Sequence, residues 1–207
     1  MSDLNEIEPW MQTSSGGAID ILSPSPAQFR LTDIAISLSL IARFNGHTLI
    51  PWSVASHSLL CEAILPREVT PMCRLYTLMH DAHEMVTGDI VTPMKEALAQ
   101  MAGADLIGRI SRDVQLAIHA AAGMPPVNAQ KTWTKAADLR ALAMEKRDIL
   151  VPSERPWKMY LPDVSKETIR IIPESIAISR RRFVQRFLHL ADAGGIVPPR
   201  PFLAGVE

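Results

Sequence analysis

Four side chains in the middle of the chain are candidates to hold one divalent metal ion: His57, His80, Asp81 and Asp138. The adjacent pair His80–Asp81 can chelate an ion from a single helical turn, and the other two ligands must come from other helices. Imidazole and carboxylate groups together suit a transition metal such as Mn, Co, Zn, Fe or Ni. For the pair alone, a histidine hydrogen-bonded to a neighbouring carboxylate is the alternative interpretation.

The residues around these candidates favour the metal. With a rotation of about 100° per residue in a helix, Glu84 projects between His80 and Asp81, where it can orient a metal-bound water. Asp138 lies in a stretch rich in alanine and leucine, and a buried carboxylate needs a partner such as a metal ion. Lys135, one turn earlier, also fits a solvated helix face.

The elements that must position these residues are predicted to be helices. Capping residues and helix-stop residues mark six or seven segments, which we expect at about 32–43, 53–65, 70–87, 92 onward, 104–122, 128–150 and 173–193. Thr32, Ser53, Thr70 and Asn128 are predicted N-caps, and Pro71 follows Thr70 at the first helical position. Strand patterns are nearly absent, although residues 14–17 could turn a small hairpin.

The fold class that follows is all-α, a helical bundle within one globular chain of 207 residues. Proline-rich stretches at both ends divide the chain into an irregular N-terminal arm at 1–30, a helical core at 31–150 and a C-terminal extension with a last helix at 151–207.

Charge and cysteine usage exclude several classes of protein. Lys plus Arg is 21 and Asp plus Glu is 22, giving a formal charge of -1, which argues against a strongly basic nucleic-acid binder. Cys61 and Cys73 form no CxxC, so neither a disulfide framework nor a cysteine-based zinc site is expected. No secretory signal precedes the arm, and the longest apolar stretch is too short to span a bilayer. We therefore expect a cytoplasmic protein with no membrane partner.

One sixteen-residue string resembles a known family. Residues 80–95, HDAHEMVTGDIVTPMK, resemble the HD-domain phosphohydrolases, in particular the bacterial 5'-deoxynucleotidase branch with its HDxxE…TGDxxTPxK pattern. Shorter phage-encoded HD hydrolases share the pattern, including dATP triphosphohydrolases of phages that replace adenine in DNA. The strings RFNGH at 43–47 and SVASHS at 53–58 are also similar. The resemblance covers about residues 31–150, and it implies an HD-domain fold for the helical core.

The resemblance implies roles residue by residue. The implied metal ligands are His57, His80, Asp81 and Asp138. Glu84 would hold or activate the attacking water, Asp89 would act near the phosphate and the leaving oxygen, and Arg43 would bind phosphate.

The loop after Arg43 departs from the branch, which often has Trp at the next position. Phe44 keeps an aromatic wall beside the substrate but offers no N–H donor. His47, in the same loop, is a candidate substrate contact. Lys95 could balance the charge of the substrate, although a plain surface position is the alternative. For His83 we expect a place on the rim of the pocket and no metal.

The implied reaction is hydrolysis of the 5' phosphoester of (deoxy)nucleotides. Two versions remain open: release of phosphate from a deoxynucleoside monophosphate, and release of triphosphate from a dNTP such as dATP. A non-catalytic module that binds nucleotide or nucleic acid is a further alternative. The expected partners are the nucleotide substrate and other copies of the chain, in a homo-oligomer that is a dimer or larger, with no stable nucleic-acid partner. The location would be the host cytoplasm if the chain is phage-encoded.

Overall fold

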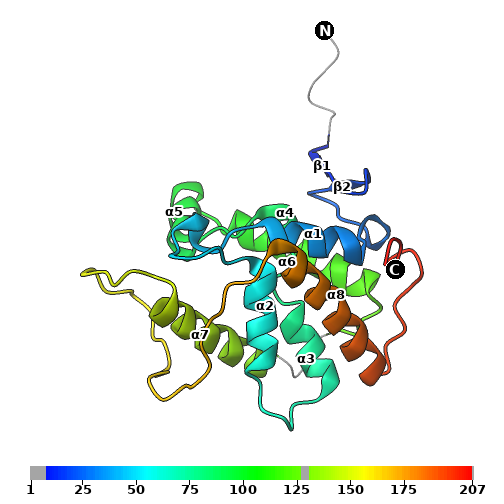
Figure 1. Cartoon of the computed structure of the whole chain (residues 1–207). Coiled ribbons are helices and arrows are strands. Elements are labelled where there is room, and N and C mark those ends of the chain that lie inside the picture. Colours follow the sequence, from blue (N-terminus) through cyan, green and yellow to red (C-terminus); the bar gives the residue numbers. More distant parts are fainter. Residues whose placement is uncertain (1–7, 127–130, 207) are drawn as a thin grey trace.

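The computed structural model describes residues 8–126 and 131–206, which are mostly helical (Figure 1). The elements are β1 (Trp10–Gln12), β2 (Ala18–Asp20), η2 (Pro26–Gln28), α1 (Leu31–Leu40), η3 (Arg43–Gly46), α2 (Val54–Ala63), α3 (Pro71–Leu78), α4 (Glu84–Thr87), α5 (Thr92–Ala102), α6 (Leu106–Ala121), α7 (Lys131–Asp148) and α8 (Ile176–Ala193). The all-α expectation is confirmed at this coarse level, because the described residues contain only one small sheet.

That sheet is the hairpin predicted around residues 14–17. β1 pairs with β2 in antiparallel register, with Met11 opposite Ile19. Asp33 of α1 anchors the turn: its carboxylate accepts hydrogen bonds from the backbone N–H of Ser15 at 2.8 Å and from the Ser15 hydroxyl at 2.7 Å. Ile19 is fully buried in the helical core, so the hairpin is packed onto the rest of the molecule.

The N-caps predicted at Ser53 and Thr70 are confirmed, but the one predicted at Thr32 is wrong, because α1 begins at Leu31 after Arg30. The Ser53 hydroxyl accepts a hydrogen bond from the N–H of Ser56 at the start of α2, and the Thr70 hydroxyl accepts one from Cys73 at the start of α3. The cap predicted at Asn128 lies outside the described residues.

The single helix predicted over residues 70–87 is wrong, because the chain breaks between α3 and α4. The ring Nδ1–H of His80 donates to the carbonyl of Thr77 at 2.8 Å. In a continuing helix that carbonyl would accept from the N–H of Asp81. The backbone proceeds instead through tighter bonds to carbonyls three residues earlier, such as the one from Glu84 to Asp81. The angular positions predicted from a straight helix therefore do not apply, although the same residues still converge.

Helix packing brings three site-bearing elements together. α8 packs against α1, α2 and α3, and α7 packs against α2 and α3 (Figure 1). The main core contains Phe183 and Phe187 of α8, both fully buried. A second apolar cluster, which includes Cys61, Ala141 and Met144, joins α2, α3 and α7. The C-terminal helix thus belongs to the same core as the helices that carry the candidate ligands.

An ionic cluster joins α2, α3 and α8. The Glu62 carboxylate, 3% exposed, accepts hydrogen bonds from Arg74 at 2.7 Å and from Arg186 at 2.6 and 2.8 Å. Burial by itself raises the pKa of Glu62, but the hydrogen bonds from the two arginines outweigh it and lower the pKa. The cluster holds the C-terminal end of α2 against α3, and His57 lies on the same helix.

We expect Glu62→Gln to lower the free energy of unfolding by roughly 2–4 kcal/mol, because two partly buried guanidinium groups would lose their counter-charge. The measurement is urea unfolding at pH 7, with the exposed Glu68→Gln as the matched control. Because the folded pKa of Glu62 is lowered, its contribution is present above the ordinary carboxyl pKa and is lost as the pH falls through the folded value. Equal unfolding midpoints for the two variants would contradict this assignment.

Candidate metal centre

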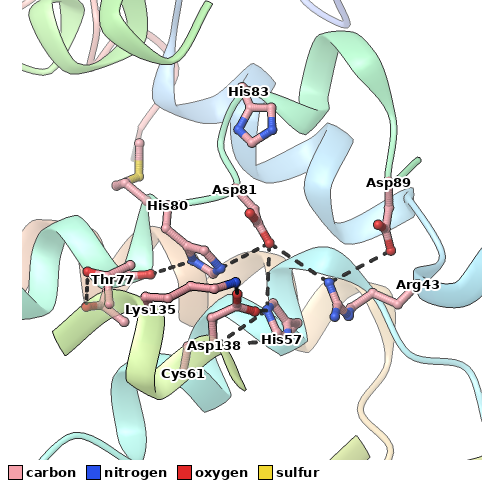
Figure 2. A network of polar contacts seen from close by, with 12 residues as sticks. Arg43, His57, Cys61, Thr77, His80, Asp81, His83, Asp89, Lys135 and Asp138 are labelled. Atoms are coloured by element: carbon pink, nitrogen blue, oxygen red, sulfur yellow. Dashed lines mark hydrogen bonds and ion pairs between the residues drawn. The ribbon is translucent and has the colours of Figure 1, made fainter. Parts of the chain in front are cut away.

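The four predicted ligands converge from α2, from the turn after α3 and from α7 (Figure 2). His57 Nε2 lies 3.6 Å from an Asp81 oxygen and 3.4 Å from an Asp138 oxygen. His80 Nε2 lies 3.1 Å from the same oxygen of Asp81. Donor atoms that share one ion at bond lengths of about 2.1 Å stand roughly 3–3.5 Å apart. These three separations are close to that range. The donor atoms that all lie within 4.8 Å of one another are those of His57, Cys61, His80 and Asp138, while Asp81 belongs to a neighbouring group with His83 and Glu84.

Hydrogen bonding fixes which ring nitrogen each histidine presents. His57 Nδ1 lies 2.7 Å from a buried Glu145 oxygen, and a carboxylate can only accept, so Nδ1 carries the hydrogen. His80 Nδ1 likewise donates to the Thr77 carbonyl. In the neutral imidazole the other nitrogen is then a bare lone pair. Both Nε2 lone pairs therefore face the Asp81 and Asp138 carboxylates.

Such an arrangement of acceptors needs a cation between them. His80 Nε2 is buried and has no hydrogen-bond partner. Burial and the charge of Arg43 lower the pKa of His57, but negative groups that include Glu145 and Asp138 outweigh both and raise it well above its ordinary value. The centre thus attracts positive charge, which either a proton or a metal ion can supply. The donor set of two imidazoles and two carboxylates fits a divalent transition metal.

The two carboxylates are held at low pKa by their neighbours. Burial raises the pKa of Asp81, but the adjacent His80 outweighs it and leaves the pKa well below the ordinary range. Burial also raises the pKa of Asp138, and His57 and His80 more than reverse that effect. The second Asp138 oxygen accepts from Lys135 Nζ at 2.9 Å. Both carboxylates are therefore ionised at neutral pH, as metal ligands must be.

Glu145 is a site residue that the sequence-based ligand set did not include. It is fully buried on α7 and accepts hydrogen bonds from His57 Nδ1, Trp52 Nε1 at 2.6 Å and Arg43 at 3.0 Å. Its position seven residues after Asp138, on the same face of the helix, was the available signal. A carboxylate behind a metal-ligating histidine orients the ring and increases its basicity.

Cys61 is the second residue that the sequence did not single out. It lies one turn after His57 on α2, fully buried, with its sulfur 3.4 Å from His57 Nε2. Together with His57, His80 and Asp138 it completes a group of possible metal donors. Burial raises the pKa of the Cys61 thiol, so the thiol is neutral in the metal-free protein. The i, i+4 spacing of His57 and Cys61 was the only sequence signal for it.

Glu84 and His83 flank the ligands on the other side of Asp81. Asp81, His83 and Glu84 place donor atoms within 4.8 Å of one another. Glu84 is 3% exposed, and its Oε2 is buried without a hydrogen-bond partner. Burial and the charges of Asp81 and Asp89 raise the pKa of Glu84 to about 9. Glu84 thus lies beside Asp81, at the start of α4.

Arg43 and Asp89 lie next to Asp81 at the edge of the centre. Arg43 is 7% exposed, and one of its nitrogens lies 3.9 Å from Asp81 and 3.8 Å from Asp89 (Figure 2). Burial lowers the pKa of Arg43, but the carboxylates around it, led by Glu145, more than offset this effect. Gly88 ends α4 with a φ of 72°, a conformation that side chains rarely adopt, and so turns Asp89 toward Arg43.

The remaining predicted site residues lie around this centre. Phe44 follows Arg43 and is half-buried, with a φ of 54°, a left-handed backbone that costs a non-glycine residue roughly 1–2 kcal/mol. His47 is exposed in the same turn and belongs to neither group of donors. Lys95 is partly buried on α5, where its charge acts to lower the pKa of Glu84.

A cavity opens next to Asp89. Its volume is about 370 Å³, and its lining includes Ala42, Asn45, Gly88, Asp89 and Met94. This volume falls within the usual range for small-molecule sites. Of the site residues described above only Asp89 lines this cavity, so the cavity adjoins the centre through that residue alone.

No protein-family model matches the chain. It is 36% identical over 154 residues to an uncharacterized protein of Rhodobacter capsulatus, a match that covers 70% of this chain and 75% of that protein. It is 33% identical over 162 residues to the uncharacterized protein YfdR of Escherichia coli strain K12, covering 78% of this chain and 84% of YfdR. The chain belongs to the YfdR family.

Neither relative's name states an activity, so the argument for function depends on the site. As for the membrane, no helix in the described part of the chain combines the length and apolar character needed to cross a bilayer.

We expect Glu145→Gln to weaken metal binding by roughly 10- to 100-fold. The amide keeps one acceptor for His57 and Trp52 but turns an NH₂ group toward Arg43, so the orientation of His57 is disturbed while the four ligands remain. Calorimetric titration of the chelator-treated protein with Mn²⁺ measures the change, and the exposed Glu154→Gln is the control. Equal affinities in the two variants would mean that Glu145 does not support His57.

Metal binding is also expected to release a proton. Because the pKa of His57 is raised, the metal-free centre holds a proton that the ion must displace. The affinity for Mn²⁺ should then fall as the pH is lowered, by up to about tenfold per unit. Titrations at pH 6, 7 and 8, in buffers of different ionisation enthalpy, count the protons released. A constant affinity and no proton release would contradict the expected exchange.

Proposed function

We propose that the chain is a metal-dependent phosphohydrolase of the HD-domain type that acts on the 5' phosphoester of (deoxy)nucleotides. The observation that carries the proposal is the position of the two Nε2 atoms, on His57 and His80, which face the carboxylates of Asp81 and Asp138. These are the four residues that the resemblance implies as ligands. A bound ion would polarise a phosphoryl oxygen and lower the pKa of a water molecule.

Glu84 is the proposed proton acceptor. Its Oε2 is buried beside Asp81 and hydrogen-bonded to no partner among the described residues, so it is available to a water proton. With a pKa of about 9 this carboxyl is protonated at neutral pH in the metal-free protein. A cation bound beside Asp81 would lower that pKa and give the ionised form, which accepts the proton. Asp89, across from Arg43, is placed to act near the leaving oxygen.

Cationic side chains offset the charge of the substrate from several directions. Arg43 is buried behind the carboxylates and already bonded to Glu145, so we propose that it acts chiefly through its charge. Lys95 lies near Glu84, and the exposed Lys135 holds Asp138 at the rim. Phosphate oxygens that approach the ion would therefore meet positive charge at Lys95 and Lys135.

The substrate proposal keeps both reactions open. The cavity beside Asp89 supports a small-molecule substrate, and release of phosphate from a monophosphate or of triphosphate from a dNTP such as dATP would use the same ion. The proposed ion is Mn, Co, Zn, Fe or Ni. The further parts of the proposal are a location in the cytoplasm and assembly with other copies of the chain.

The test is a panel of NMPs, dNMPs and dNTPs incubated with the protein and Mn²⁺ or Co²⁺, with the products identified as phosphate or triphosphate. Hydrolysis that disappears with chelator and returns with metal is the expected result. Metal binding with no hydrolysis of any nucleotide would overturn the enzymatic proposal and favour a non-catalytic binding module.

We expect Glu84→Gln to retain metal and substrate while lowering turnover by roughly 10²- to 10⁴-fold, because the amide cannot accept the water proton. The measurements are kcat, KM and metal content of the two proteins, with the exposed Glu96→Gln on α5 as the control. If turnover is unchanged in Glu84→Gln, this carboxyl has only a structural role.

A further inference from the structure

The segment that follows α7 brings an aromatic side chain close to the metal centre. Trp157 is half-buried, and its ring centre lies 6.4 Å from that of Phe44, with the two planes inclined by 43°. Phe44 in turn lies with its ring centre 5.3 Å from the guanidinium carbon of Arg43. Because Arg43 borders Asp81 and Asp89, the aromatic pair lies just outside the centre.

Hydrogen bonds from two arginines of α7 hold the end of this segment. Arg147, at the end of α7, donates hydrogen bonds to the carbonyls of Val164 and Ile169, at 2.8 Å each. Glu167 accepts a hydrogen bond from Arg140, also on α7, at 2.9 Å. Residues 151–156 and 158–160 are exposed on either side of Trp157. Residues 164–169 therefore hold the loop on α7, while Trp157, nearer the middle of the loop, contacts Phe44.

We propose that Phe44 and Trp157 form an aromatic clamp that takes the nucleotide base between their rings. A planar ring needs about 3.5–4 Å on each face, so the two rings would have to stand about 7–8 Å apart. At 6.4 Å and with their planes inclined by 43° they are too close and not parallel, so the exposed loop would have to swing outward and turn the Trp157 ring to open the slot. The left-handed backbone of Phe44 is a strained conformation of the kind found at functional sites.

This inference rests on the proposed function and adds to it a substrate class and a second specificity residue. Every base has a π-face, so stacking tolerates both purines and pyrimidines. The clamp therefore selects nucleotides over sugar phosphates and discriminates weakly among bases. Lys146, whose Nζ lies 4.9 Å from the Trp157 ring centre, helps to hold that ring at the rim.

The experiment compares ligands with and without a base. In the Glu84→Gln background, where turnover is slow, calorimetry measures the binding of dAMP, dTMP, dATP and deoxyribose 5-phosphate to the Mn²⁺-loaded protein. Adding Trp157→Ala should weaken the nucleotides by roughly 5- to 150-fold and leave deoxyribose 5-phosphate within about twofold. Trp157→Phe should restore most of the affinity. Tyr160→Ala, an exposed aromatic in the same loop, is the control and should change nothing.

Several outcomes overturn the clamp. Unchanged nucleotide affinity in Trp157→Ala would place the base elsewhere, for instance in the cavity beside Asp89. Equal weakening of nucleotides and deoxyribose 5-phosphate would mean that Trp157 supports only the loop. Either result, with hydrolysis intact in the protein that retains Glu84, leaves the proposed function standing. A protein with neither affinity for nucleotides nor hydrolysis would overturn both proposals.

Discussion

Two imidazole lone pairs that face two carboxylates impose the constraint on which the candidate site depends. Glu145 and Thr77 each accept the Nδ1–H of one histidine, so the Nε2 atoms of His57 and His80 face the carboxylates and can offer them a hydrogen only when a ring takes up an extra proton. Four acceptors at such spacing repel one another until a cation enters. The fold brings them together by packing α2, α3 and α7 around a small apolar cluster. An ion that binds there would in turn tie these three helices together.

The same hydrogen bonds connect the site to the local backbone. The bond from His80 to the Thr77 carbonyl takes an acceptor that a continuous helix would use, and α3 ends there. The tight turn that follows carries Asp81 toward His57 and Glu84 into a buried position between charged neighbours. Glu145 is buried among His57, Trp52 and Arg43 and accepts a hydrogen bond from each of them. The orientation of the His57 ring therefore depends on the same carboxylate that binds the buried Arg43. The hydrogen bonds of His80 and Glu145 thus set both the local backbone and the positions of the charged groups at the centre.

Much of this could be predicted from the sequence, for identifiable reasons. Capping at Ser53 and Thr70 is local chemistry, and it marked α2 and α3 correctly. The four candidate ligands could be picked out because their side-chain types are chemically distinctive and because residues 80–95 resemble a known family. The break after α3 could not be predicted, because it depends on one side chain competing for a backbone carbonyl. Glu145 and Cys61 were missed because each acts through His57, a contact that only the packing of α7 and α2 creates. Trp157 lies in a segment without a periodic pattern, so its contact with Phe44 was invisible to sequence reasoning.

Anomalous diffraction from crystals grown with Mn²⁺ tests the central claim most directly. One strong peak is predicted per chain, within about 2.0–2.3 Å of His57 Nε2, His80 Nε2 and one oxygen each of Asp81 and Asp138. A peak elsewhere on the chain, or no peak between these four residues at saturating metal, would contradict the claim that this cluster is a metal site.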